Sequence, residues 1–338
     1  MSYWTKEELR VLRRLREGFI QGTAGEADYW GEQELELYDA TFAQRIAWKW
    51  DAVLGELQLR GWLPQANRIV DLGCGTGIAS RRVLEQWPEQ FRSVTLMDRS
   101  PLARVFAAKQ VRELAPRCEV KSAGSGEVDC SGALVLASHV ITELDEAQLG
   151  AWIKSIQTAA AVIWVESATH AASRQLIARL REALLKTGQW GAIAPCTHQG
   201  GCPLLLESNA QHWCHHFARV PSEAHQDPGL GELSRELGVD MRVLPYSFLV
   251  MANRGAGDLP EEGARVIGRA REFKGYLKVL ACAASGLTDW TLQKRDVPEI
   301  FKALRKEDGV PLYRWQTEGE RIVSGERLLS STPDSSEE

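Results

Sequence analysis

A glycine-rich turn after a short apolar run is the feature that most constrains the fold of this 338-residue chain. Residues 68–72 read Arg-Ile-Val-Asp-Leu, and glycines follow at Gly73, Gly75 and Gly77. A strand that bends sharply into a helix needs glycine where a side chain would block the bend or a ligand. The first turn of such a helix offers free amides and the positive end of its dipole. The pattern therefore predicts a strand–turn–helix unit with a ligand site at the turn.

The alternation of strand-like and helix-like segments continues along the next hundred residues. Four further runs predict strands, at residues 93–98, 118–121, 133–138 and 161–166. Helical patterns lie between and after them, at residues 101–114, 146–159 and 169–186. Strands that alternate with helices predict an α/β fold with a doubly wound, mostly parallel sheet.

The remaining residues suggest further segments around this sheet. A capping box at Thr5 and Glu8, followed by an apolar face that recurs over residues 42–57, predicts N-terminal helices. We expect four parts: a helical region at 1–64, an α/β domain at 65–262 with a cysteine-rich insertion at 190–230, a small basic β-rich module at 263–329, and a disordered tail at 330–338.

Net charge, apolar runs and cysteine count indicate the cellular compartment and the classes of partner to expect. The net charge of −5 argues against a surface that grips nucleic acid everywhere, and no DNA partner is expected. No run of about 18 apolar residues predicts a membrane span, and the first residues lack the apolar core of a secretory signal. Seven cysteines, an odd number, do not indicate a disulfide framework. We therefore expect a cytoplasmic protein whose clustered cysteines bind a metal.

The spacing of the turn separates two cofactor classes. The dinucleotide fingerprint would place a glycine at position 78, which is Ile78, whereas the third glycine here is Gly77. The acid Asp71 also precedes the turn. In both respects the turn resembles motif I of the class I methyltransferases. That resemblance implies S-adenosylmethionine at the three glycines, with Asp71 holding its methionine end.

Two later strand ends add candidates for the same site. Asp98 ends the second strand, where a carboxylate can accept both ribose hydroxyls of either cofactor class. Ser138 ends the fourth strand, and we include it among the cofactor-binding residues. His139 titrates near neutral pH and is a possible base, but a lone histidine also serves in packing. The motif typical of methyltransferases of exocyclic base nitrogens is missing here, so the sequence assigns no catalytic residue.

Three cysteines lie within 19 residues, at Cys196, Cys202 and Cys214, and Cys282 follows 68 residues later. Thiolates bind either zinc or iron–sulfur clusters. The C-x5-C-x11-C spacing lacks the paired knuckles of structural zinc and so favours a cluster, while zinc stays open. His198 is the main competitor for the fourth ligand position.

A longer series of residues resembles one family. It runs Ala194-Pro195-Cys196-x-His198, then Cys202-Pro203, then Trp213-Cys214-His215-x-Phe217, with further matches at 134–138, 143–144, 165–166, 246–250, 273–282 and 294–296. The series resembles the mitochondrial small-ribosomal-subunit methyltransferase-like family, which has bacterial members and is implicated in small-subunit assembly. The resemblance covers residues 65–315, and the chain departs from it at Thr76, Ile78 and Ser167.

The resemblance implies a function as well as a fold. It implies a [4Fe–4S] cluster held by Cys196, Cys202, Cys214 and Cys282, and the small ribosomal subunit with its rRNA as partner. Residues 263–315 carry eleven Lys or Arg against six Asp or Glu, which suits phosphate binding. Within that segment we expect Lys294, Arg295, Arg305 and Lys306 to contact RNA, and Trp290 and Trp315 to stack on unpaired bases.

Two other functions remain open at this stage. The chain can instead be a methyltransferase of a small molecule or a protein, with a structural zinc site. It can also be a redox- or iron-sensing regulator in which loss of the cluster controls binding. Whether methyl transfer takes place at all is left open, because a methyltransferase fold does not by itself imply the activity.

Overall fold

The computed structural model describes residues 3–22, 30–124, 126, 128–240, 243–253 and 262–329; the predicted tail at 330–338 lies outside them. The chain divides into two compact units. Unit 1 consists of Met1–Leu54, Pro64–Ser167 and Ala218–Tyr246, and unit 2 of Gly55–Leu63, Ala168–Phe217 and Ser247–Glu338.

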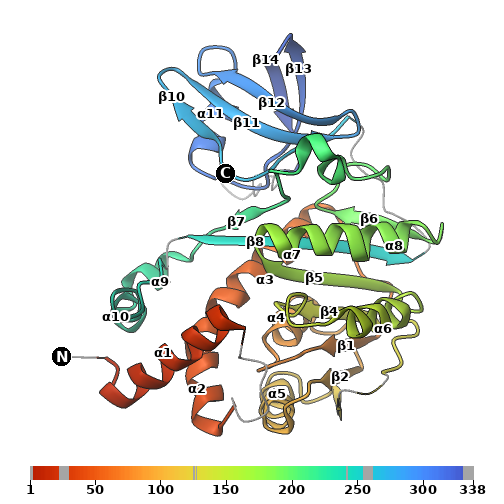
Figure 1. The fold of residues 1–338 in the computed structure, drawn as a ribbon, viewed down its shortest axis with the longest axis vertical. Helices are drawn as coiled ribbons and strands as arrows, with labels where there is room; N and C mark the ends of the chain where they lie inside the picture. The colour runs from red at the N-terminus through yellow and green to blue at the C-terminus, as the bar shows by residue number, and fades with distance from the viewer. Residues whose placement is uncertain are drawn as a thin grey trace, which may run out of the picture. The chain divides into compact units, whose positions relative to one another are not determined.

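Unit 1 is built on five parallel strands (Figure 1). They are β1 (Arg68–Leu72), β2 (Ser93–Met97), β3 (Glu119–Ala123), β4 (Leu134–Ser138) and β5 (Ala161–Ser167). Their order is β3-β2-β1-β4-β5, and every pairing is parallel. The strands β1, β4 and β5 are buried almost throughout, as expected of parallel strands whose two faces are both covered.

Helices connect these strands, as the alternating pattern predicted. They are α4 (Ile78–Gln86), α5 (Pro101–Leu114) and α6 (Glu146–Ile156). The start of α5 follows from its sequence: the Ser100 side chain accepts a hydrogen bond from the Ala103 amide, and Pro101 occupies the first turn.

The N-terminal helices are α1 (Lys6–Gln21), α2 (Glu32–Ala40) and α3 (Phe42–Leu59), and α1 begins at the predicted Thr5–Glu8 capping box. Two later helices of unit 1, α9 (Ser222–Gln226) and α10 (Pro228–Leu237), follow in the chain. Leucines of α1, α2 and α10 share one buried cluster: Leu12, Leu15, Leu37, Leu230, Leu233 and Leu237. None of the helices that the structure describes is long and apolar enough to cross a membrane.

The second segment of unit 2, Ala168–Phe217, starts with a helix that contains a π-helical stretch in its middle. Its parts are α7 (His170–Gln175), a π-helix at Leu176–Arg181, and α8 (Glu182–Leu185). The sequence predicted one regular helix here, and no residue pattern marks the π-turn. Strand β6 (Trp190–Ala194) runs antiparallel to β8 (Leu244–Asn253), and the short strand β7 (His216–Ala218) also pairs with β8.

The larger sheet has the strand order β3-β2-β1-β4-β5-β8-β6, with β7 off this path. This order confirms the predicted doubly wound α/β fold of the class I methyltransferase type. The predicted helices that precede the first strand in the sequence are also present. The strand β6 falls in the segment that the sequence assigned to an irregular insertion, so that segment is more regular at its start than predicted.

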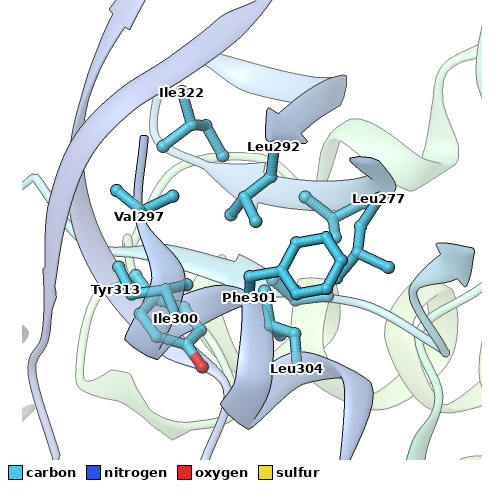
Figure 2. Close-up of a cluster of buried hydrophobic side chains, with 10 residues drawn as sticks. Leu277, Leu292, Val297, Ile300, Phe301, Leu304, Tyr313 and Ile322 are labelled. Atoms are coloured by element: carbon cyan, nitrogen blue, oxygen red, sulfur yellow. The ribbon is translucent and has the colours of Figure 1, made fainter. Parts of the chain in front are cut away.

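The predicted C-terminal β module is also confirmed. It contains β9 (Ala264–Val266), β10 (Arg271–Phe273), β11 (Tyr276–Ala283), β12 (Gly286–Gln293), α11 (Pro298–Arg305), β13 (Leu312–Glu318) and β14 (Arg321–Arg327). The order is β10-β11-β12-β14-β13-β9, and β9 pairs with β11 as well, so the sheet closes on itself. Figure 2 shows the module's core, where Leu277 and Leu292 of the sheet meet Phe301 of α11.

A buried ion-pair network ties the module to the end of α3 within unit 2. Glu56 Oε1 accepts hydrogen bonds from Arg60 Nη2 and Arg265 Nη1, both at 2.7 Å. The side chains of Glu56, Arg60 and Arg265 are only 2%, 7% and 3% exposed, respectively. Burial alone would raise the pKa of Glu56, but the two guanidinium groups hold it below its ordinary value of 4.5.

We predict that Glu56→Gln lowers the free energy of unfolding by about 3–5 kcal/mol, because it leaves two buried guanidinium groups without their counter-charge. Since the pKa of Glu56 is lowered by folding, its stabilisation is complete above pH 4.5 and is lost as the pH falls further. The wild-type and variant proteins should therefore converge in stability below that pH, as followed by urea denaturation.

The matched control is Glu326→Gln, which removes one partner of the exposed Arg314–Glu326 pair in the same unit. It should change the free energy of unfolding by less than about 1 kcal/mol. Equal losses in the two variants, or a difference that does not shrink in acid, would contradict the assigned role of Glu56.

Candidate functional site

The glycine-rich turn lies between β1 and α4, and its three glycines have positive φ angles: 72° at Gly73, 53° at Gly75 and 78° at Gly77. A Cβ on Gly73 would lie 2.6 Å from Val140 Cγ1, and one on Gly77 would lie 3.0 Å from Ala107 Cβ. A Cβ on Gly75 would meet nothing within 4 Å. Gly73 and Gly77 are therefore required by close packing as well as by φ, whereas Gly75 borders open space where a ligand can approach the backbone.

Asp71 is fully buried at the end of β1. Its Oδ2 atom accepts a hydrogen bond of 2.7 Å from Ser80 Oγ on α4, while Oδ1 has no hydrogen-bond partner. Burial raises the pKa of Asp71 to about 7, and the hydrogen bonds from Ser80 only partly oppose this. The hydroxyl of Thr76, in the turn itself, is also buried without a partner. The site thus contains two orphaned polar atoms, which a polar ligand can satisfy.

Asp98 follows β2 and stays partly exposed. Its Oδ2 accepts a hydrogen bond from the Gly75 amide and its Oδ1 one from the Ser100 amide, both at 2.9 Å. The carboxylate therefore fixes the glycine turn against the neighbouring strand. Its remaining lone pairs stay available to hydroxyl groups of a ligand.

Ser138 and His139, at the end of β4, contact two residues of α3. Trp50 Nε1 donates a hydrogen bond of 3.0 Å to Ser138 Oγ, and His139 Nδ1 lies 3.2 Å from the same oxygen. His139 Nε2 lies 3.0 Å from Lys49 Nζ. His139 has φ = 57°, a left-handed conformation that is uncommon outside glycine and that recurs at functional sites.

Burial and the neighbouring charges determine the protonation of Lys49 and His139. Burial, reinforced by Arg45, lowers the pKa of Lys49 to about 7, and Glu166 opposes the shift. Burial, followed by the charges of Lys49 and Arg45, lowers the pKa of His139 well below its usual range. At neutral pH the imidazole is therefore uncharged, and the amine beside it can exchange a proton.

Glu166, at the end of β5, organises the loop after β4. Its Oε1 atom accepts hydrogen bonds from Trp164 Nε1 at 2.7 Å and from the Ile141 and Val140 amides at 2.8 and 2.9 Å. Burial raises the pKa of Glu166 to about 7 in spite of these donors. The loop that carries His139 is thus fixed by a carboxylate to which the sequence gave no role.

Sequence reasoning missed Lys49 entirely and treated Trp50 only as part of an apolar helix face. Neither residue stands out in the sequence, because a lysine within an amphipathic helix normally faces solvent. Only the packing of α3 on the ends of β4 and β5 brings Lys49 to His139.

The four cysteines singled out in the sequence line one pocket of unit 2. Cys196 and Cys202 lie on the loop after β6, Cys214 precedes β7, and Cys282 is on β11. Cys202, Cys214 and Cys282 also pack against a small buried cluster of Ile177, Leu204 and Ile267. The other three cysteines, Cys74, Cys118 and Cys130, do not line this pocket.

Arg181, the last residue of the π-helix, holds the first cysteine loop from inside the protein. Its side chain is 1% exposed. Its Nε atom donates to Cys196 Sγ at 3.3 Å, and its Nη2 atom donates to the carbonyl oxygens of His198 at 3.2 Å and Gly200 at 2.7 Å. The sequence gave no signal for these contacts, nor for the π-helix that ends at Arg181.

Two histidines lie beside these thiols. His198 Nε2, the predicted competitor ligand, is 4.0 Å from Cys282 Sγ, and His216 Nε2, which the sequence did not single out, is 3.5 Å from Cys214 Sγ. Among the residues with assigned positions, no group of three or more His, Cys, Asp or Glu is arranged to hold a metal ion. Burial raises the pKa of Cys202 to about 11 and also raises the pKa values of Cys214 and Cys282.

Solved structures with related folds include several methyltransferases. A putative RNA methyltransferase from Pyrococcus horikoshii is 12% identical, with a TM-score of 0.37, and the match covers 72% of this chain and 99% of that one. Magnesium protoporphyrin IX methyltransferase from Synechocystis, solved with bound SAM, is 12% identical, with a TM-score of 0.39 and coverages of 75% and 100%. A SAM-dependent methyltransferase from Aquifex aeolicus is 16% identical, with a TM-score of 0.33 and coverages of 41% and 73%.

These TM-scores all lie below 0.5, so the likenesses add nothing to what the strand order establishes. Among functionally curated proteins, no sequence matches the chain at a significant level. One family model, described as the mitochondrial small ribosomal subunit Rsm22, matches residues 40–310. Because this match covers well over half of the sequence, the chain belongs to the Rsm22 family.

Proposed function

We propose that the chain is an S-adenosylmethionine-binding factor that acts on the small ribosomal subunit and its rRNA during assembly in the cytoplasm. We further propose that it holds a [4Fe–4S] cluster on four cysteines. The observation that carries the first proposal is the site of Asp71, Gly75 and Asp98 in a chain whose family is named for the small ribosomal subunit.

The residues around the turn fit S-adenosylmethionine. The ligand's ammonium group would provide the partner that Asp71 Oδ1 lacks, and its ribose hydroxyls would satisfy the free lone pairs of Asp98. Gly75 leaves room for the ligand to approach the backbone. When bound, the ligand supplies an electrophilic methyl group, and the chain's own residues orient it at the ends of β1, β2 and β4.

We predict that Asp98→Ala weakens S-adenosylmethionine binding about 5- to 150-fold, the effect of about 1–3 kcal/mol for a lost buried polar partner. Isothermal titration measures the affinity, and thermal melts check that the variant is folded. The control is Asp129→Ala, whose carboxylate is exposed and pairs with Arg68. Wild-type protein that gives neither heat nor a thermal shift at saturating ligand would refute the cofactor proposal.

For transfer to a nitrogen or oxygen that carries hydrogen, a proton must leave the acceptor. The groups placed to receive it are His139 and Lys49, since the imidazole is uncharged and the amine titrates near neutral pH. Both residues are half-buried. Val140, next to His139, contacts the turn at Gly73, so these groups lie beside the proposed cofactor site.

We predict that Lys49 reacts with an amine-specific reagent with a midpoint near pH 7, read by peptide mass spectrometry. The exposed Lys154 serves as the internal control for access of the reagent. Glu166→Gln keeps the Oε1 acceptor but removes a negative charge that raises the pKa of Lys49, so the midpoint should fall further. A midpoint for Lys49 near the ordinary lysine value of about 10.4 would exclude it as a proton acceptor at neutral pH.

The cysteine pocket fits an iron–sulfur cluster by its donor set. Four thiols from three segments of the chain line one pocket, and the buried Arg181 guanidinium adds positive charge beside Cys196. A single zinc ion would need four sulfurs about 2.3 Å from one point, whereas a cubane binds each thiolate to a different iron. Cluster binding would require these thiols to lose their protons.

We predict that serine at Cys196, Cys202, Cys214 or Cys282 removes or degrades the cluster and lowers the melting temperature, because a cluster joins β11 to the loops after β6. Iron, sulfide and zinc analysis after anaerobic purification measures this. Cys118→Ser, in unit 1, is the control and should keep full iron content. One zinc and no sulfide in the wild type would refute the cluster, and loss of iron in His198→Ala but not in Cys282→Ser would refute the ligand assignment.

A further inference from the structure

The C-terminal module has a strand arrangement that the sequence did not reveal. Around the closed sheet the order is β9-β11-β12-β14-β13 and back to β9. All of these pairings are antiparallel except β12 with β14, and α11 lies between β12 and β13. Numbered along the chain, this is the order 1-2-3-5-4-1 with a helix between strands 3 and 4, the arrangement of the OB-fold. In that fold the face of strands 2 and 3 binds oligonucleotides.

The register shows which side chains form that face here. Leu277 and Val279 of β11 are buried, and with Leu292 of β12 they belong to the core drawn in Figure 2. Side chains alternate along a strand, and directly opposite residues share a face. The outer face therefore has one row of Phe273, Tyr276 and Gln293 and a second row of Arg271, Lys278 and Thr291.

An aromatic pair lies in the first row. The rings of Phe273 and Tyr276 are stacked, with centroids 4.9 Å apart and planes 6° from parallel. Phe273 is 44% exposed, although phenylalanine is usually buried. This stacked pair, in which Phe273 is exposed and Tyr276 half-buried, offers a flat surface on which further aromatic rings can stack.

Positive charge lies directly beside this pair. The side chains of Arg271 and Lys278 are 55% and 35% exposed, and Lys274 is exposed in the turn between β10 and β11. Asp289 of β12 pairs with Arg271 and lies 4.0 Å from Lys278, which holds both basic groups against the sheet. The face thus carries the aromatic pair Phe273–Tyr276 and the basic pair Arg271–Lys278, each formed across the neighbouring strands β10 and β11.

We propose that this face of β10, β11 and β12 is a binding site for single-stranded RNA, in which unpaired bases stack on Phe273 and Tyr276 while phosphates contact Arg271 and Lys278. The proposal rests on the proposed rRNA partner and specifies the form of RNA that is bound. Paired bases are already stacked in a duplex and hide their faces, so only a single strand can use the aromatic pair.

This site differs from the residues that the sequence pointed to. Trp290 and Trp315, the predicted stacking residues, pack against the core of the module, and Trp315 stacks on Tyr313. Among the predicted basic residues, Arg305 pairs with Glu272 and Arg295 lies 3.7 Å from Asp296. In the described part of the module, residues 262–329, the exposed aromatic residue is Phe273 at the β10–β11 hairpin.

The test uses the full-length wild-type protein with a fluorescent single-stranded RNA 12-mer, and the same 12-mer annealed as a duplex, measured by anisotropy. A double variant, Phe273→Ala with Tyr276→Ala, should bind the single strand at least 10-fold more weakly with an unchanged salt dependence, since stacking is worth about 1–3 kcal/mol per base. Arg271→Gln with Lys278→Gln should lower the slope of log affinity against log salt by about 1.4, the value for two phosphates on a single strand.

Val105→Ala serves as the control, because Val105 is an exposed apolar residue on α5 and should leave binding unchanged. Ultraviolet crosslinking of the wild-type protein gives a readout that needs no variant, and the crosslinked peptide should contain residues 271–278. Wild-type affinity in the aromatic double variant, equal loss of single-strand and duplex binding, or crosslinks confined to other segments would each overturn the proposal.

The experiment distinguishes failure of the proposed assembly role from failure of the proposed RNA site. If the wild-type protein binds the single-stranded 12-mer through this face but does not bind purified small ribosomal subunits, the site stands and the assembly role is wrong. If it binds the subunits and the aromatic double variant binds them and the 12-mer equally well, the role stands and the site is wrong.

Discussion

The buried guanidinium of Arg181 is the group on which the cysteine pocket depends. It makes hydrogen bonds to Cys196 Sγ and to two carbonyl oxygens of the following loop, so it fixes a segment with little regular structure of its own. A buried cation needs nearby negative charge or several acceptors, and Glu182 supplies only part of this, with a side chain that is 22% exposed. Thiolates on the proposed cluster would supply more, so binding of such a cluster would favour the burial of Arg181, and the reverse.

Strand β11 links that pocket to the proposed RNA face. Tyr276, Lys278 and Cys282 occupy alternate positions and therefore project from the same side of the strand. Cys282 lines the pocket, while Tyr276, six residues and about 20 Å away, belongs to the stacked aromatic pair. A ligand on Cys282 holds one end of the strand that presents Tyr276 at the other. This gives a physical route by which loss of a cluster can weaken RNA binding, without any contact between cluster and RNA.

Much of unit 1 could be predicted from the sequence, because its signals are local. The turn glycines, the acids that end β1 and β2, and the caps of α1 and α5 each depend on a few consecutive residues, and the structure places them as the spacing indicated. The site around His139 could not be predicted in the same way. Lys49 reaches it from a helix 90 residues earlier, and Glu166 from the next strand, so the three meet only through tertiary packing.

In unit 2 the limits of prediction have the same cause. The four cysteines stand out by residue type, whereas Arg181 does not, since an arginine in a helix usually faces solvent and this one is buried at the end of a π-helix. The closed sheet of the module was predicted as β-rich, but its strand order depends on pairings between β9, β11 and β13 that are distant in sequence. That order decides which aromatic residues face outward. Trp290 is turned toward the core because it pairs with Val279, while Tyr276 projects from the opposite face with its ring stacked on Phe273.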